Sequence, residues 1–437
     1  PLVGAPRVAG ASGQRVGLVM EKTPFYAEQG GQVSDIGEIR GANGAVFKME
    51  QALKFGPYVL HCGTMAAGEI SKGSAVTGAV DEDYRNMVYP NHTMTHVLNL
   101  ALRAVLGKVG QKEVDQKGSL CDSEKLRFDF NCQKGLKPAQ LKEVEDICND
   151  QIKQALSIYT KVVPLASAKS ISTLRAVFGE TYPDPVRVVS VGKKIEDLLA
   201  DPQNPDWMKY SVELCGGTHM DNTSESKLLV LVEESGVAKG IRRIKCLTGA
   251  LALEAEATRK AFEQRIVAAN ALPADKMEAE ERAIFQALGS LVCSAAAKAQ
   301  FKDDIKKLTK KVVKYKKEKS AKLGKVAMEE GKRIAEEAKT NGTPFCVNLV
   351  GFGTDGKIAK NVLKAMLKAH PDGAFMLVSP DSNGKIGAYA GAGKATSKKL
   401  SAKDWCGALS GSFGGRGGGK PENAQWVGEL SAATAEV

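Results

Sequence analysis

Hydrophobic and polar residues change their spacing three times along the chain and so divide it into four segments. In residues 1–85 apolar residues come in short runs, such as 15–20, 58–62 and 75–80, which glycine-rich turns separate. Short apolar runs between turn residues are typical of β-strands. The pattern predicts a small antiparallel structure, a β-barrel in our interpretation, with a sandwich as the alternative.

The second segment, residues 86–250, mixes helical and strand patterns. Apolar residues recur every three to four positions from Asn91 to about Leu106, so we predict a helix that begins directly after Pro90. A further helix is predicted from Pro138. Strands are predicted at residues 125–130, 186–191, 227–233 and 241–246. Together these elements predict an α+β domain.

The third segment, residues 251–340, is rich in alanine, glutamate and lysine and has a single proline, which predicts long helices. Within it, Ile305, Leu308, Val312 and Tyr315 follow the 3-4-3 spacing of an amphipathic helix or coiled-coil seam. Fourteen Lys and Arg against seven Asp and Glu make residues 301–340 basic. The segment therefore predicts a helical or coiled-coil region with a cationic face.

The last segment returns to mixed patterns. Strands are predicted at 345–352, 374–379 and 386–390, with helices at 359–369 and near 403–409. This predicts a small α/β domain. The chain as a whole is therefore predicted to be an α+β multidomain protein with domains at residues 1–85, 86–250, 251–340 and 341–437.

Composition limits the class of protein. The chain is 43% hydrophobic and 25% charged, and it has no apolar run near the roughly 20 residues that span a bilayer, so we expect no membrane association. A net charge of +11 favours a polyanionic partner. Nine cysteines are widely spread without a C-x-x-C motif, which favours reduced thiols in a cytosol-like compartment.

Three of the five histidines fall in two motifs with four-residue spacing. His92 and His96 lie in the predicted helix, where residues i and i+4 project from one face with Cβ atoms about 5–6 Å apart. Cys215 and His219 are separated by two glycines, which permit turns that bring both side chains together. Three imidazoles and a thiolate select Zn²⁺. The spacing therefore predicts one zinc site.

Two other interpretations of these residues stay open. The histidines can be ordinary helix residues with Cys215 a buried thiol, or the zinc can be structural, because four protein ligands close the coordination sphere while catalytic sites keep a position for water. A zinc protease is disfavoured. The residue directly after the first histidine is Thr93, where the H-E-x-x-H motif requires a glutamate base.

Several further segments resemble one family. Residues 23–32, Thr-Pro-Phe-Tyr-Ala-Glu-Gln-Gly-Gly-Gln, with Asp35 and Gly37 beyond them, resemble the T-x-F-Y-x-E-x-G-G-Q signature of the alanyl-tRNA synthetase editing domain. Residues 115–119, 126–130 and 240–244 resemble other parts of that domain, and residues 414–421 resemble the glycine-rich tail of the synthetase's C-terminal domain. The chain thus resembles the C-terminal portion of that family, and it is similar to free-standing alanyl-tRNA editing proteins.

The resemblance implies a hydrolase that cleaves the ester of tRNA(Ala) mischarged with serine or glycine, with one Zn²⁺ held by His92, His96, Cys215 and His219. An alanine pocket discriminates against glycine or serine by only about 10–10², so a second site is needed. Thr95 is the candidate for a hydrogen bond to the serine hydroxyl, and Gln116 is expected to face the ester. Alternatively, the Thr95 hydroxyl bonds the carbonyl four residues earlier.

The role of the zinc stays open between activation of a water molecule and positioning of the substrate's 3′ end. Asp221, two residues beyond His219, is a candidate for orienting an imidazole, with a surface role as the alternative.

The resemblance also implies that the terminal domain binds tRNA and that residues 251–340 form a homodimer. The candidate RNA contacts are Lys310, Lys314, Lys317, Arg416 and Lys420. A solvated helix face is the alternative for the lysines, and a flexible hinge is the alternative for the glycines around Arg416.

The adenylating domain that uses ATP has no counterpart in the chain, which begins at Pro1. We therefore expect a portion of a synthetase, with a free-standing editor or a non-catalytic tRNA-binding or dimerisation module with structural zinc as alternatives. The expected location is the cytoplasm, with an organellar form left open.

Overall fold

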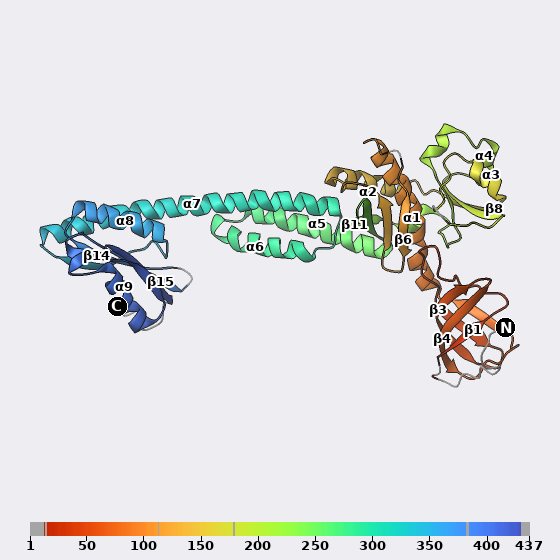
Figure 1. Cartoon of the computed structure of the whole chain (residues 1–437), viewed down its shortest axis with the longest axis horizontal. Coiled ribbons are helices and arrows are strands. Elements are labelled where there is room, and N and C mark those ends of the chain that lie inside the picture. Colours follow the sequence, from red (N-terminus) through yellow and green to blue (C-terminus); the bar gives the residue numbers. More distant parts are fainter. Residues whose placement is uncertain (1–12, 14, 112, 178–179, 382–383, 430–437) are drawn as a thin grey trace. The chain divides into compact units, whose positions relative to one another are not determined.

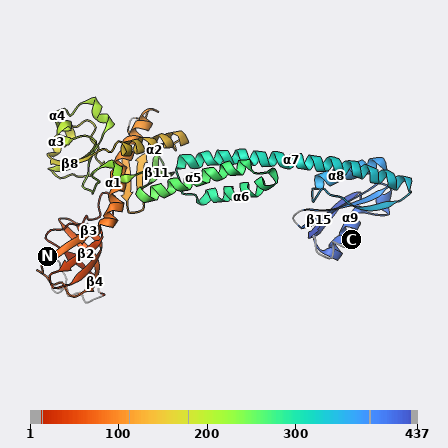
Figure 2. The same ribbon diagram turned by 180° about the vertical axis from the view of Figure 1, so that it is seen from behind.

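The computed structural model describes residues 13, 15–111, 113–177, 180–381 and 384–429. It divides into two compact units, the first formed by residues 1–272 and 279–306 and the second by residues 273–278 and 307–437. Figures 1 and 2 show helices and sheets in both units, which confirms a mixed α+β multidomain chain. No helix of the described residues is long and apolar enough to cross a membrane.

The first sheet contains five antiparallel strands in the order β1-β4-β3-β2-β5. The strands are β1 (Arg15–Val19), β2 (Gly37–Gly41), β3 (Val46–Phe55), β4 (Tyr58–Ala67) and β5 (Val76–Val80). Alternate residues, such as Ile39, Phe47 and Met65, point inward and form the core. The pairing of the described strands runs in a line from β1 to β5, so closure into a barrel stays a prediction.

Helix α1 (Glu82–Gly107) begins before the predicted position. The carboxylate of Asp81 accepts a hydrogen bond from the Tyr84 N–H at 2.9 Å and caps the helix, and two acidic residues follow in the first turn. Pro90 lies inside the helix, so the prediction of a start directly after it is wrong. The acidic cap sets the start of the helix, and the proline removes only one backbone donor.

Helices α1 and α2 (Pro138–Lys153) share a core with a four-stranded antiparallel sheet. Its order is β11 (Leu229–Ala238), β12 (Ile241–Thr248), β7 (Leu126–Asn131) and β6 (Gln116–Cys121). Val97 and Leu98 of α1, Phe128 of β7 and Ile244 of β12 are fully buried in this core. The core therefore fixes the face of α1 that carries the histidines.

A three-stranded antiparallel sheet with its own core completes this region. Its order is β10 (Ser211–Leu214), β9 (Val186–Val191) and β8 (Ile158–Val163), and the short helices α3 (Leu165–Ser170) and α4 (Ile195–Ala200) pack on it. Short 3₁₀ turns at Pro205–Lys209 and Thr223–Ser226 lie in the connections. Strand β10 ends directly before Cys215 and so delivers the second metal motif.

Three helices follow: α5 (Gly249–Ala271), α6 (Ala274–Ser290) and α7 (Ala295–Thr340). Arg265 of α5 pairs with Glu280 of α6 at 2.6 Å, and the rings of Phe262 and Phe301 join α5 to α7 with centroids 5.1 Å apart. The 3-4-3 spaced residues Ile305, Leu308 and Val312 are at most 5% exposed within a single chain. A dimer would therefore need other residues than this predicted seam.

The second unit ends in a five-stranded sheet with helices α8 (Gly356–Ala369) and α9 (Ala402–Phe413). Its order is β13 (Phe345–Leu349), β14 (Ala374–Pro380), β15 (Lys385–Ala392), β17 (Asn423–Glu429) and β16 (Arg416–Lys420), and only the pairing of β13 with β14 is parallel among the described strands. A 3₁₀ turn lies at Thr396–Lys398. Residues 416–420 of the glycine-rich tail therefore form an edge strand of this sheet.

Candidate metal centre

The two predicted motifs converge on one point. One donor atom from each of His92, His96, Cys215 and His219 lies within 4.8 Å of the others. The Cys215 Sγ is 3.3 Å from His92 Nε2 and 3.4 Å from His219 Nε2. Ligands about 2.0–2.3 Å from a tetrahedral zinc lie roughly 3.3–3.7 Å from one another. The donor set and its spacing therefore fit Zn²⁺.

Two of the imidazoles are oriented by hydrogen bonds from their outer nitrogens. His92 Nδ1 donates to Gln32 Oε1 at 2.6 Å. The Thr93 hydroxyl donates to the Tyr89 carbonyl and so accepts from His219 Nδ1 at 3.1 Å. A proton on each Nδ1 leaves each Nε2 unprotonated, with an electron pair that can bind a metal, and both Nε2 atoms face the sulfur. These partners hold both rings in the tautomer that binds a metal.

The third imidazole has a buried nitrogen without a partner. His96 Nδ1 makes no hydrogen bond, while His96 Nε2 lies 3.6 Å from Glu213 Oε2. A buried nitrogen that is left unsatisfied costs about 1–3 kcal/mol. A cation bound among the four donors would remove this cost, which is a second observation that fits a metal.

The charge state of the centre also favours a cation. Burial lowers the pKa of His96 to about 3 and holds the pKa values of His92 and His219 well below their usual range. Burial raises the pKa of the Cys215 thiol to about 11. The imidazoles are therefore neutral, and a thiolate at this position needs a bound cation to balance its charge.

The turn after Cys215 depends on glycine and on an arginine. A Cβ on Gly217 would lie 2.0 Å from His92 Cε1, whereas a Cβ on Gly216 would meet nothing within 4 Å. The Arg187 guanidinium of β9 donates to the carbonyls of Cys215 and Gly217 at 3.0 and 2.7 Å. The second glycine thus lets the histidine approach the turn, and the arginine holds the turn in place.

The loop of residues 23–32 brings Gln32 to the centre. Gly31 has φ +86°, and a Cβ there would lie 2.2 Å from Ser119 Oγ. The Gly31 carbonyl accepts from the Cys121 N–H at 2.7 Å, which fastens the loop to β6. Gln32 is 1% exposed, and its Nε2 donates to Thr218 Oγ1 at 2.7 Å. Gly31 is therefore needed for the close approach of the loop to β6, which brings Gln32 to the centre.

A cavity of about 720 Å³ opens beside the metal centre. His92, His96 and Cys215 form one part of its wall, and Thr95 and Gln116 line it as well. The Thr95 hydroxyl donates to the Asn91 carbonyl at 2.8 Å, as the alternative interpretation expected, and its oxygen, which can still accept, lies 3.3 Å from the Cys121 Sγ. Gln116 Nε2 donates to Ser119 Oγ at 3.0 Å.

Sequence reasoning missed some of the residues that support the centre. In the sequence, Thr93 was evidence only against a zinc protease. Its hydroxyl in fact orients the His219 ring, which is the role expected of Asp221. Asp221 is exposed, and its backbone N–H donates to Glu225. Glu213 is buried, and desolvation raises its pKa to about 7. Its position only two residues before Cys215, in the strand that leads to the metal motif, was the available signal.

The RNA candidates belong to the second unit, whereas the metal centre belongs to the first. Lys310, Lys314 and Lys317 project around Val313 on α7 and form what we call the lysine patch. Arg416 and Lys420 are the first and last residues of β16, and all five residues of that edge strand are exposed. Cationic side chains therefore flank a strand of three glycines whose backbone is accessible.

Comparisons with known proteins agree on one family. Residues 7–84 match the model described as tRNA synthetases class II (A), and residues 186–245 match the threonyl and alanyl tRNA synthetase second additional domain, which contains Cys215 and His219. Residues 252–315 match an alanine–tRNA ligase domain, and residues 342–437 match the DHHA1 domain.

The relatives extend this result over nearly the whole chain. The mitochondrial alanine–tRNA ligase of Saccharomyces cerevisiae is 40% identical over 96% of this chain and 43% of its own length. The alanine–tRNA ligase of Schizosaccharomyces pombe is 39% identical over the same shares, and the cytoplasmic one of Dictyostelium discoideum is 36% identical over 95% and 44%. The chain thus spans less than half the length of these relatives.

The fold, the ligand set and these matches define an aminoacyl-tRNA synthetase chain with an editing-type domain. More narrowly, the chain belongs to the alanyl-tRNA synthetase family, of which it represents the C-terminal portion. A crystal structure of the C-Ala domain from Aquifex aeolicus alanyl-tRNA synthetase is also similar. It is 20% identical, covers 21% of this chain and 81% of that chain, and has a TM-score of 0.19.

Proposed function

We propose that this chain is the proofreading portion of an alanyl-tRNA synthetase and hydrolyses Ser-tRNA(Ala) and Gly-tRNA(Ala) at a zinc ion held by His92, His96, Cys215 and His219. The observation that carries the proposal is the convergence of these four donors at the wall of a large cavity. Ligation of alanine with ATP is proposed for a part of the parent enzyme outside this chain.

The cavity favours a functional over a purely structural zinc. Four protein ligands would close the coordination sphere as at structural sites, but three of these donors also line a space of about 720 Å³ that can hold a ligand beside the ion. Pockets that bind small ligands usually measure about 300–1,000 Å³. The end of a charged tRNA, an amino acid on a terminal adenosine, is a ligand of this size class.

Thr95 and Gln116 are proposed to select and orient the substrate. The Thr95 hydroxyl already donates to Asn91, so its oxygen can accept the proton of a serine hydroxyl. An alanyl ester has no such donor and would leave this buried oxygen with only the weak contact of the Cys121 thiol, whose Sγ lies 3.3 Å away. Gln116 lies on β6 at the same cavity, where its amide can contact the ester. Glycine is accepted because it is smaller than serine.

In the proposed reaction, a water molecule adds to the ester carbonyl and the bond between the carbonyl carbon and the ribose oxygen breaks. The products are a free amino acid and a tRNA with a free ribose hydroxyl. Bound zinc would supply positive charge, either to lower the pKa of a water or to hold the substrate's 3′ end. Gln32, Thr93 and Glu213 are positioning residues, which act through the imidazoles that they contact.

The second unit is proposed to hold the tRNA. The lysine patch and the glycine strand β16 with Arg416 and Lys420 offer cationic groups that suit phosphates. Of the proposed domains at residues 1–85, 86–250, 251–340 and 341–437, the first two are supported by separate hydrophobic clusters. Residues 327–338 of α7 share a cluster with the last domain, so the boundary at residue 340 is only a division of the sequence. A homodimer through residues 251–340 stays part of the proposal, with contacts outside the buried 3-4-3 residues.

A single-turnover deacylation assay tests the proposal. Zinc-loaded protein should release serine from Ser-tRNA(Ala) rapidly, and removal of zinc with a chelator should abolish the release until zinc is restored. Cys215→Ala should lose both zinc and activity. If the Cys215→Ala protein loses zinc yet deacylates at the full rate, the metal has no part in the chemistry.

The same assay separates the alternatives. A protein that binds zinc and tRNA but never deacylates is a binding module with a structural zinc. Gly216→Ala is a suitable control for the folding of the second motif, because a Cβ there meets no atom within 4 Å. This variant should keep its zinc.

A further inference from the structure

Helix α1 carries a row of polar residues that continues beyond the metal ligands. His92, His96, Asn99 and Arg103 follow a 4-3-4 spacing, which places them on one face of the helix. The helix is otherwise largely apolar where it is buried. The metal accounts for the first two members of the row, so the last two need another explanation.

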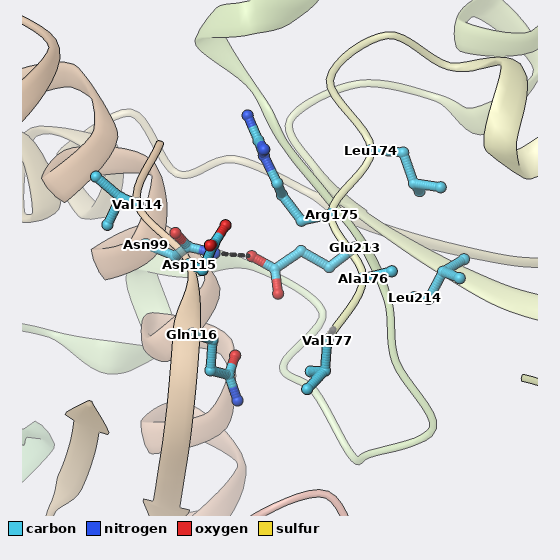
Figure 3. Close-up of a pocket in the computed structure, with 10 residues that line it drawn as sticks. All are labelled: Asn99, Val114, Asp115, Gln116, Leu174, Arg175, Ala176, Val177, Glu213 and Leu214. Carbon is cyan, nitrogen blue, oxygen red and sulfur yellow. Dashed lines mark hydrogen bonds between the residues drawn. The ribbon is translucent and has the colours of Figure 1, made fainter. Parts of the chain in front are cut away.

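Asn99 borders a second, smaller cavity of about 150 Å³ (Figure 3). In Figure 3 its amide faces Glu213, to which it donates at 3.2 Å. Arg175 and Gln116 border the same cavity. Glu213 and Gln116 also line the large cavity, so these two side chains lie between the two spaces.

Several buried polar atoms around this cavity have no partner. They are Asn99 Oδ1 and Arg175 Nε, on residues that line the cavity, and the Nε and Nη2 of Arg103, which does not line it but interacts electrostatically with Arg175 and Glu213. Asn99 is only 4% exposed. Burial and the nearby charge of Arg175 lower the pKa of Arg103 to about 10. Two guanidinium groups near each other without sufficient partners are unfavourable unless an anionic group or water satisfies them.

We propose that this cavity is a product site for a small free amino acid, which it receives from the adjoining metal centre. The inference rests on the proposed function. Hydrolysis of the ester creates a carboxylate that the substrate lacked, and Arg175 is the cationic residue among those that line the cavity, so it is the candidate to bind this group. Glu213 and Asp115 offer acceptors for the α-ammonium group.

The mixture of charges identifies the ligand class. A phosphate would meet the carboxylates of Glu213 and Asp115 and be repelled, whereas a zwitterion matches cationic and anionic walls together. The volume holds about five water molecules at ~30 Å³ each, which suits glycine or serine and excludes large side chains. The site would therefore retain the amino acids that editing releases.

Equilibrium dialysis of zinc-loaded full-length chain with L-serine tests the proposal. Serine should bind, while serinol, which has no carboxylate, should bind more weakly. Arg175→Gln should weaken serine binding by about tenfold or more, as expected for the loss of a hydrogen bond between charged groups. The same change should leave serinol binding and zinc content unaltered. Arg15→Gln, at a side chain 74% exposed, is the matched control.

A second variant distinguishes a loss of the binding site from misfolding of the Arg175→Gln protein. Ala176 lines the cavity from an exposed position, so Ala176→Phe should fill the space without removing a charge and should also weaken serine binding. If both variants bind serine as the unmodified chain does, serine occupies only the metal cavity and the inference is wrong. If the chain deacylates Ser-tRNA(Ala) but binds no serine, the inference of a product site is wrong while the proposed function stands. If it does neither, the proposed function fails as well.

Discussion

The metal centre of the first unit and the cationic surface of the second unit differ in how their residues are held. At the metal centre, each imidazole has a buried neighbour, such as Gln32 for His92 or Thr93 for His219. In the lysine patch, the side chains project from one helix into solvent, and Lys314 lies 3.9 Å from Glu318 with both largely exposed.

This difference decides what each region is able to do. Side chains fixed by buried hydrogen bonds can place a metal to within a fraction of an ångström, and one wrong contact disturbs all of them. Exposed cations act mainly through charge, and their contributions are small and nearly additive. Substitutions at the first region should therefore have large and specific effects, and those at the second should have modest and graded effects.

The largest effect is expected for Gly217→Ala. The new Cβ would lie 2.0 Å from His92 Cε1, so either the ring or the turn must move. A displaced metal loses several kcal/mol of stabilisation, so single-turnover deacylation should fall on the order of 10³-fold. Measured zinc content should fall as well. Normal zinc content and rate in this variant would mean that the two motifs do not share an ion.

Thr93→Val tests the hydrogen bonds that hold the metal ligands in place. Valine has nearly the same shape but cannot accept from His219 Nδ1 or from the Met220 N–H. Loss of such a partner typically lowers metal affinity or activity about 10–100-fold. Competition with a zinc chelator would measure the affinity. Thr64→Val, at a partly exposed hydroxyl of β4 that donates to Glu50, should leave it unchanged.

The same difference explains how much could be predicted from sequence. The ligands were found because a helix fixes the i, i+4 geometry and two glycines mark a turn. The partners of the ligands were harder to find, since Gln32 comes from a loop 60 residues before His92 and Glu213 from a separate sheet. Only the tertiary structure brings such distant residues together.

The elements of the fold were also predictable only where their signal is local in the sequence. Long helices and apolar strands were predicted well, because their periodicity is local. The start of α1 was misplaced because Pro90 was weighed above the cap at Asp81. The strand β16 was missed because Arg-Gly-Gly-Gly-Lys has no apolar alternation, and its pairing with β17 depends on backbone hydrogen bonds.

A smaller effect is expected for Thr95→Val. The variant removes the proposed acceptor of the serine hydroxyl while it keeps the shape of the side chain. Hydrolysis of Ser-tRNA(Ala) should fall about tenfold, and that of Gly-tRNA(Ala) should not change, because glycine has no hydroxyl. Thr95→Ser keeps the hydroxyl and should retain the preference. An equal loss for both substrates would instead assign Thr95 a structural role through its bond to Asn91.

The smallest effect on chemistry is expected from neutralising the lysine patch. Lys310→Gln, Lys314→Gln and Lys317→Gln together should lower the dependence of tRNA affinity on salt by about 2–3 units of logarithmic slope, roughly one per phosphate contact. Deacylation at saturating tRNA should stay the same, because the hydrolytic cavity contains none of these residues. A triple variant at the exposed residues Lys142, Lys153 and Lys209 is the control.

If both triple variants change the slope equally, only net charge matters and the patch is a solvated helix face. If the patch variant slows deacylation even at saturation, the second unit also positions the substrate, and the contrast between a chemical and a holding region breaks down.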